Sequence, residues 1–394
     1  MNIDKNGKFH MNEYSWHIVA NTLYIESPGG VGFSYIDSDM KYDKVINDDI
    51  TAEDNLNALI DFFKKFPSYK NNDFYISGES YAGIYIPMLS YKIIQYNKGV
   101  VESKKINLKG ILIGNGVVDW SIDMNKATYD FAFSHHLTSY ENRMEVNKYC
   151  LIDYDEEKCN ESLKEINSWL EGVNVYDILR ECELPTTETG DRDYFSNYYL
   201  SNSWAFPDLK KKQDELKQKL EKMKLNPDQN KNNSNNIKNK KKLTMTPPCY
   251  DDKAMSEYFN RNDVKEALHV NKDLNWELCS SDIVQRYEMQ AKGSLWAFPT
   301  ILDSGIRILI YNGDTDLKVP FPSNQAFIDK LNLEEIKPWT QWKAFGDKNN
   351  LAGYYVKYKG LTFCTIKGTG HMVPEWKPRE AFYMLSKFLN NQDF

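Results

Sequence analysis

Long apolar runs are missing from this chain of 394 residues. No stretch approaches the roughly 20 consecutive apolar residues that cross a bilayer. The segment from Met1 to Phe9 is polar and does not have the composition of a secretory signal. The net charge of −7 leaves no overall excess of positive charge for binding nucleic acid. We therefore expect no membrane insertion and no nucleic-acid partner.

Zinc-type patterns are also missing. The chain has six cysteines and six histidines, but no Cys-x-x-Cys pair and no Cys/His cluster with zinc spacing. We therefore expect no metal. The Tyr- and Trp-rich stretches are typical of core and cap packing rather than of a cofactor site, so we expect no organic cofactor either. Four of the cysteines lie in loop-like surroundings, as in exported proteins where cysteines close loops. They are Cys150, Cys159, Cys182 and Cys249.

Apolar strands and amphipathic helices alternate in two parts of the sequence. We predict strands over residues 23–26, 74–77, 108–113, 307–311 and 360–367, and helices over 48–65, 85–96 and 378–389. Strands that alternate with helices in this way form a parallel sheet with crossover helices. The sequence therefore predicts an α/β fold.

A different kind of sequence separates these two parts. From Trp120 to Cys249, charged and aromatic helical stretches alternate with loops, and residues 208–243 hold twelve lysines and five acidic residues. Residues 226–242 have too few apolar side chains to offset the entropy of ordering, so we expect disorder there. We predict a core formed by residues 1–120 and 250–394, which a helical cap over residues 121–249 interrupts.

The segment Gly78-Glu79-Ser80-Tyr81-Ala82-Gly83 lies between a predicted strand and a predicted helix. A serine on such a turn, flanked by glycines, is the nucleophile of α/β-hydrolases, in which a neighbouring base takes its proton. However, Gly-x-Ser turns are common without function, and Ala82 stands where the generic motif has its second glycine. The motif alone is therefore weak evidence.

The order of an acid and a base along the chain strengthens this hypothesis. α/β-Hydrolases place Ser, then Asp, then His in the sequence, the last two on loops after late strands. Asp316 follows the predicted strand 307–311, and His371 follows the predicted strand 360–367. A structural alternative stays open for Asp314 and Asp316, because Asn-Gly-Asp also favours a turn.

Longer segments of the chain resemble the serine carboxypeptidase family. Gly-Glu-Ser-Tyr-Ala-Gly at 78–83 matches that family's nucleophile motif, and Gly-Thr-Gly-His-Met-Val-Pro at 368–374 resembles its histidine motif. Gly-Asp-Thr-Asp at 313–316, with Val319-Pro320 after it, resembles the aspartate segment, in which Asp316 holds the triad position. Segments 26–35, 113–116 and 262–269 are similar too. The resemblance implies an α/β-hydrolase fold with a mostly parallel sheet and an inserted helical cap.

The resemblance also implies a role for each residue of the site. Ser80 would attack the scissile carbonyl, His371 would act as general base and then acid, and Asp316 would orient the imidazolium. The backbone N–H of Tyr81 would donate to the oxyanion. Glu79 would bind the C-terminal carboxylate of the substrate by sharing a proton with it. Since this requires one protonated carboxyl group, the resemblance implies an acidic working pH.

One segment of the family has no counterpart in this sequence. It is a Trp-x-Asn-Gly-Gly-Pro-Gly-Cys-Ser-Ser stretch, which supplies the second oxyanion donor, an asparagine for the substrate carboxylate and a cysteine. The glutamate that partners Glu79 follows that stretch in the family. We therefore expect a missing N-terminal part, signal peptide included. We also expect this polypeptide alone to be weakly active or inactive, because one oxyanion donor contributes about 2.7–4 kcal/mol to the transition state.

The pairing of the cysteines and the compartment follow from the same resemblance. It implies disulfides Cys150–Cys159 and Cys182–Cys249, and it leaves Cys279 without its family partner. It also implies a secreted protein or one of a lysosome- or vacuole-like compartment. Glycosylation sequons begin at residues 160 and 232, although such triplets are common by chance.

The sequence thus predicts a serine carboxypeptidase that removes C-terminal residues from peptides and proteins through an acyl-enzyme. Two alternatives stay open. One is transfer of the acyl group to an alcohol, as some relatives of the family do, and the other is a catalytically inactive binding protein.

Overall fold

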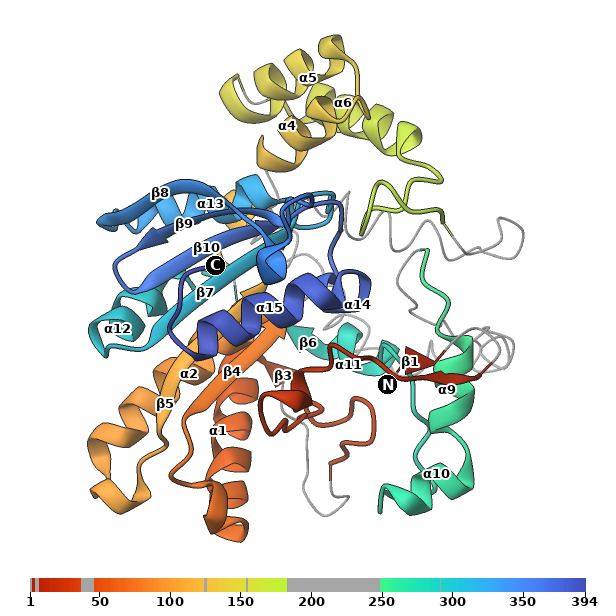
Figure 1. The fold of residues 1–394 in the computed structure, drawn as a ribbon. Helices are drawn as coiled ribbons and strands as arrows, with labels where there is room; N and C mark the ends of the chain where they lie inside the picture. The colour runs from red at the N-terminus through yellow and green to blue at the C-terminus, as the bar shows by residue number, and fades with distance from the viewer. Residues whose placement is uncertain are drawn as a thin grey trace, which may run out of the picture.

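The structure, a computed structural model, describes residues 2–3, 7–36, 46–123, 126–153, 155–182, 249–290 and 292–394. Figure 1 shows a central sheet with helices on both faces and a separate group of helices beyond one end of the sheet. The lysine-rich stretch 208–243, with its predicted disorder, lies outside the described residues.

The central sheet has six strands in the order β4-β5-β7-β10-β9-β8. Four of them are mutually parallel: β4 (Phe74–Glu79), β5 (Leu108–Gly114), β7 (Arg307–Gly313) and β10 (Leu361–Ile366). The last two, β9 (Gly353–Tyr358) and β8 (Glu335–Trp342), each run antiparallel to the strand before them in that order. The sheet joins distant parts of the sequence, since Gly110 of β5 pairs with Arg307 of β7.

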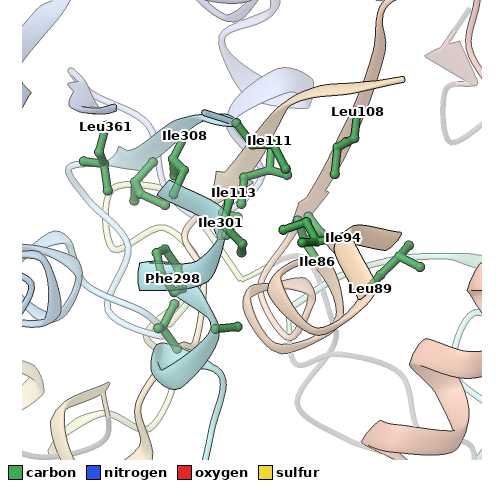
Figure 2. Packing of buried hydrophobic residues seen from close by; sticks show 14 of the residues in the cluster. Ile86, Leu89, Ile94, Leu108, Ile111, Ile113, Phe298, Ile301, Ile308 and Leu361 are labelled. Atoms are coloured by element: carbon green, nitrogen blue, oxygen red, sulfur yellow. The ribbon is translucent and has the colours of Figure 1, made fainter. Parts of the chain in front are cut away.

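Helices cover both faces of this sheet because successive strand residues point to opposite sides. Ile111 and Ile113 of β5 enter one buried cluster, and Leu112 enters the other. Four helices contribute side chains to the cluster on the first face: α1 (Asp48–Lys65), α2 (Ala82–Gly99), α12 (Phe298–Asp303) and α13 (Phe321–Lys330). Figure 2 shows residues of α2 and α12 packed against the strands. The second face is covered by α15 (Pro378–Leu389).

The helices beyond the end of the sheet belong to the predicted cap. They are α4 (Lys126–Ser134), α5 (Tyr140–Val146), a π-helical turn (Asn147–Ile152) and α6 (Glu156–Trp169). The short α3 (Trp120–Asp123) leads to them, but its Trp120 and Ile122 are buried in clusters of the core. Side chains of α4, α5 and α6 bury one another in a cluster of their own, which also includes Leu317 of the core. This contact places the cluster beside the carboxyl end of β7.

Shorter elements connect these parts. The helices are α9 (Lys253–Phe259), α10 (Asn262–Ala267), α11 (Ser281–Arg286) and α14 (Val373–Trp376). Two small sheets pair β1 (Asn2–Ile3) with β2 (Phe9–His10), and β3 (Ile46–Asn47) with β6 (Tyr287–Glu288). Within the described part of the chain, no helix is both long enough and apolar enough to cross a membrane.

Most predicted elements are confirmed, and one is wrong. The helices predicted over 48–65 and 378–389 are α1 and α15. The strand predicted over 23–26 does not form, and Leu23, Tyr24 and Ile25 are exposed. An apolar extended run becomes a strand only where a neighbour supplies hydrogen bonds and a packing surface. No described strand pairs with these residues.

Candidate active site

Ser80 lies on the turn between β4 and α2. Its φ of 62° is unusual for a residue with a side chain, and this conformation costs of order 1–3 kcal/mol. Backbone hydrogen bonds hold the turn: the N–H of Ser80 donates to Gly114 O at 2.9 Å, and the N–H groups of Gly83 and Val117 donate to Ser80 O at 3.0 Å each. The bonds to Gly114 and Val117 tie the turn to β5 and to the loop that follows it.

Two glycines make this turn sterically possible. A Cβ atom on Gly78 would lie 2.6 Å from Ala82 Cβ, and one on Gly83 would lie 2.2 Å from Val117 O. Both distances are shorter than atoms tolerate, so residues 78 and 83 must be glycine at this backbone geometry. Ala82 occupies the generic motif's second glycine position without a clash because Gly78 opposite it has no side chain.

Asp316 and His371 come together at the carboxyl ends of β7 and β10. The Asp316 side chain is 0% exposed and His371 is 3% exposed. The Nδ1 of His371 lies 2.7 Å from Asp316 Oδ2. Since a carboxylate only accepts hydrogen bonds, Nδ1 carries the proton. Asp314 accepts a hydrogen bond from Gly368 N, as a turn residue does.

Asn115, at the carboxyl end of β5, completes the environment of Asp316. Its Nδ2 donates to Asp316 Oδ2 at 2.7 Å, while its Oδ1 accepts from Gly313 N at 3.1 Å. Asn115 is fully buried, and both hydrogen bonds fix the position of the carboxylate. In the sequence, Asn115 stands only in the segment 113–116 that resembles the family, and that resemblance assigns it no role.

The second ring nitrogen of His371 is available to a substrate or nucleophile. Among the described residues, His371 Nε2 is buried and has no hydrogen-bond partner. The backbone N–H of His371 donates to Tyr176 O at 2.7 Å, and the Tyr176 ring lies 5.2 Å from the imidazole, centroid to centroid. The imidazole is therefore oriented by Asp316 on one side, and its other nitrogen can accept a proton.

Charges in the site shift the pKa values of its titrating groups. Burial raises the pKa of Glu79 to about 7; the charge of His371 opposes this shift, and those of Asp316 and Glu375 add to it. Burial lowers the pKa of His371, but the charge and hydrogen bond of Asp316 and the charge of Glu79 outweigh it. The net pKa of His371 is raised above its ordinary value. Glu79 and His371 therefore titrate as a coupled pair.

Lys318 is an ionisable residue at the site that the sequence motifs did not predict. Its backbone N–H donates to Asp316 Oδ1 at 2.8 Å and to Val175 O at 3.0 Å. Burial lowers the pKa of its ammonium group to about 7, and the charge of Asp316 partly opposes this shift. The charge of Lys318 in turn lowers the pKa of His371. A lysine just before Val319-Pro320 was the available signal.

Tyr81 follows Ser80 and forms the N-cap of α2. In the described structure its backbone N–H donates to no protein acceptor, and it stands at the positive end of an 18-residue helix. Such a group can stabilise a negative charge that develops on a substrate oxygen. No group of three or more His, Cys, Asp or Glu that could hold a metal occurs among the described residues.

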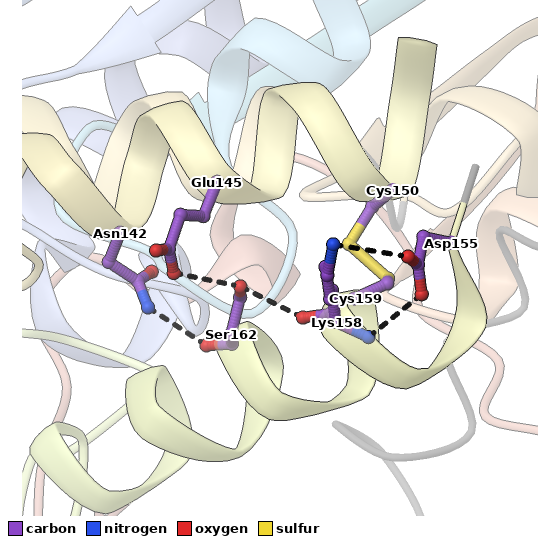
Figure 3. Close-up of a disulfide and its surroundings, with 7 residues drawn as sticks. All are labelled: Asn142, Glu145, Cys150, Asp155, Lys158, Cys159 and Ser162. Carbon is purple, nitrogen blue, oxygen red and sulfur yellow. Dashed lines mark hydrogen bonds and ion pairs between the residues drawn. A yellow bond between two sulfur atoms is a disulfide. The ribbon is translucent and has the colours of Figure 1, made fainter. Parts of the chain in front are cut away.

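Two disulfides stabilise the cap and its connection to the core. Cys150–Cys159 links the π-helical turn to α6 within the cap (Figure 3). Cys182–Cys249 joins the two ends of the segment that lies outside the described residues. Cys279 and Cys364 are free thiols. Of the two sequons, Asn160 is exposed on α6, and Asn232 lies outside the described residues.

Comparisons with known proteins give a consistent result. A sequence model of the family "Serine carboxypeptidase" matches residues 1–391. The chain is 33% identical over 390 residues to serine carboxypeptidase-like 26 of Oryza sativa subsp. japonica, covering 97% of this chain and 73% of that protein. It is 33% identical over 400 residues to the lysosomal protective protein of Mus musculus, covering 97% and 77%.

A solved structure has a similar fold. It is a crystal structure of a prohormone-processing carboxypeptidase from Saccharomyces cerevisiae, with a TM-score of 0.68 and 21% sequence identity. The match covers 99% of this chain and 78% of that one. The fold is thus the α/β-hydrolase fold with a mostly parallel sheet. The family match over nearly all of the sequence then establishes that the chain belongs to the serine carboxypeptidase family.

Proposed function

We propose that the protein is a serine carboxypeptidase that cleaves the last peptide bond of peptides and proteins. The observation that carries the proposal is the buried Asp316–His371 pair, in which His371 Nε2 has no hydrogen-bond partner among the described residues. This pair and the strained Ser80 turn lie at the carboxyl ends of strands of the same sheet. His371 removes the proton of Ser80, which attacks the carbonyl and forms an acyl-enzyme. As the acyl-enzyme forms, His371 gives this proton to the leaving amine. Water, activated by His371, then hydrolyses the acyl-enzyme and releases the shortened peptide.

Glu79 supports recognition of a free C-terminus. As the last residue of β4 it is adjacent to Ser80, and its pKa of about 7 keeps it protonated in acid. A protonated carboxyl group can donate a hydrogen bond to the carboxylate of a substrate, whereas an ionised one repels it. We therefore propose that the enzyme works best at acidic pH.

The division into core and cap follows from the same proposal. Residues 1–120 and 250–394 form the hydrolase core, and residues 121–249 form a cap next to the loop of Asp316, with Leu317 in the shared cluster. The two disulfides suit an oxidising compartment, and one relative is named as lysosomal. We propose a secreted or lysosome- or vacuole-like location.

A fluorophosphonate probe, which reacts with activated serines, tests the proposal. We expect the probe to label Ser80, as located by peptide mass spectrometry, and Ser80→Ala to abolish labelling. Ser77→Ala is the matched control, because Ser77 is an exposed serine on the same strand and should leave labelling unchanged. An unlabelled wild-type protein would contradict the proposal for this polypeptide and would fit the inactive homologue that acts only as a binding protein.

Substrate assays then separate the two enzyme reactions. A peptide with a free C-terminus should lose its last residue at acidic pH, and the same peptide with a C-terminal amide should react far more slowly. If added alcohol captured most of the acyl group in place of water, the enzyme would be an acyltransferase.

A further inference from the structure

A buried carboxylate lies next to the Ser80 turn although the proposed reaction assigns it no role. Asp48 is the first residue of α1 and is only 1% exposed. Its Oδ1 accepts hydrogen bonds from the hydroxyl groups of Tyr81, at 2.9 Å, and Tyr287, at 2.7 Å. Its Oδ2 accepts from the backbone N–H of Gln290 at 2.7 Å. Three donors thus converge on one side chain.

The local structure suits a side chain that accepts hydrogen bonds at this place. Asp48 stands at the N-terminus of an 18-residue helix, whose dipole favours an anion there. Burial raises the pKa of Tyr81 and of Tyr287 far above their ordinary value, so both hydroxyl groups remain donors. Three hydrogen bonds of 2.7–2.9 Å end on this one buried side chain. Asp48 therefore holds both tyrosines firmly.

Tyr81 is fixed by its ring as well as by its hydroxyl group. Its ring centroid lies 4.9 Å from that of Tyr85 and 6.0 Å from those of Trp120 and Tyr287. The indole N–H of Trp120 donates to Gln290 O at 2.8 Å, so the backbone that contacts Asp48 is also held in place. The side chain of Tyr81 can hardly move without breaking a bond to Asp48.

We infer that Asp48 is a positioning residue that fixes Tyr81 and thereby aims the backbone N–H of Tyr81 at the developing oxyanion. This inference rests on the proposed function. The side chain and the N–H belong to the same residue, so anchoring the hydroxyl group limits rotation of the peptide that carries the donor. Oxyanion stabilisation depends on the donor being fixed before the reaction begins.

The test measures how fast Ser80 reacts with the fluorophosphonate probe at increasing probe concentrations. This separates the maximal rate of the bond-forming step from the affinity for the probe. For Asp48→Asn we expect the maximal rate to fall about 10- to 100-fold while the affinity changes less than about twofold, because small misplacements act mainly on the transition state.

Two comparisons separate positioning from general destabilisation. Asn142→Leu removes buried hydrogen bonds in the cap, to Ser162 O and Glu165, and should leave the rate nearly unchanged. Tyr81→Phe should slow the reaction as Asp48→Asn does. The double variant should be no slower than the slower single variant, because both changes break the same contact.

The outcomes are distinct. Equal rates for Asp48→Asn and Asn142→Leu, or additive effects in the double variant, would overturn the inference. If Asp48→Asn does not fold, Tyr287→Phe removes one donor to Asp48 and is measured in its place.

If the wild-type protein is not labelled at all, the proposed function is wrong. Hydrogen exchange of the backbone amides of residues 81–84 then tests whether the hydrogen bond from Tyr81 to Asp48 holds this segment in place. Faster exchange in Asp48→Asn than in Asn142→Leu would support positioning of Tyr81, and equal exchange would refute it.

Discussion

At the scale of single residues, the site combines strain with fixed electrostatics. Ser80 keeps a positive φ because three backbone hydrogen bonds hold its turn. Asp316 is buried, and Asn115, Lys318 N and His371 all donate hydrogen bonds to its side chain. An ionised group without such donors would cost several kcal/mol to bury. The Asp316–His371 pair and the Ser80 turn are thus each held in place by hydrogen bonds of their own.

The pH dependence of the reaction depends on Glu79. Its pKa of about 7 means that the protonated form, which can bind a substrate carboxylate, is lost as the pH rises through neutrality. In Glu79→Gln the amide donates at every pH, so kcat/KM for a blocked dipeptide should no longer fall near pH 7. The charge of Glu79 raises the pKa of His371, so its removal should also move the acidic limb to lower pH.

An exposed carboxylate provides the control for this experiment. Glu375 makes the smallest contribution to the raised pKa of Glu79, so Glu375→Gln should shift the alkaline limb only slightly towards lower pH. A Glu79→Gln enzyme that kept the wild-type limb near pH 7 would show that another group controls it.

At the scale of elements, the strand–turn–helix unit from β4 to α2 depends on its close contacts. A Cβ atom on Gly83 would meet the backbone of Val117, the residue whose N–H donates to Ser80 O. A side chain at position 83 therefore pushes on the segment that holds the nucleophile. Gly99, at the other end of α2, has open space where a Cβ would stand.

These two glycines make a matched pair of variants. Gly83→Ala should destabilise the fold by about 1–3 kcal/mol, as overpacking does, and should strongly slow probe labelling of Ser80. Gly99→Ala should stabilise α2 by about 0.5–1 kcal/mol, because alanine is the better helix former, and should leave labelling unchanged. Urea denaturation and probe kinetics measure both effects. Normal labelling of Gly83→Ala would show that the turn can relax around the new methyl group.

How far the sequence predicts these elements depends on where their stabilising contacts lie. The helix 48–65 is fully predictable because its apolar face and its N-cap, Asn47, are local signals. β8 was not predicted, because it is a mostly exposed strand with the polar sequence Glu335–Trp342 and no apolar alternation. The prediction for residues 23–26 was wrong for the opposite reason: these residues are apolar, but no described strand pairs with them.

The same reasoning applies to the candidate site. Ser80, Asp316 and His371 stand in motifs after strands, so the sequence could propose them. Asp48 could not be proposed, because its donors Tyr287 and Gln290 come from the other half of the chain. The single local hint was an aspartate at the start of a helix, which normally serves only as a solvated partner of the helix dipole.

At the scale of the whole molecule, the two disulfides should differ in their contribution to stability. Cys150 and Cys159 are separated by 9 residues, and Cys182 and Cys249 by 67. Closing a longer loop removes more entropy from the unfolded chain. Replacing Cys182 and Cys249 by serine should therefore cost about 2 kcal/mol more than replacing Cys150 and Cys159.

Chemical denaturation of the two double variants measures this difference. The wild-type protein in a reducing buffer, where both bonds are broken, provides the reference for their combined loss. Equal stabilities, or a larger cost for Cys150 and Cys159, would show that local structure in the cap matters more than loop length.

The pairing of β5 with β7 has a consequence for synthesis on the ribosome. Because Gly110 hydrogen-bonds in register with Arg307, one edge of β5 stays unpaired until most of the polypeptide has been made. Pairings between such distant segments form slowly, and an exposed apolar strand is prone to aggregate while it waits. The nascent first half should therefore need a chaperone until the second half emerges.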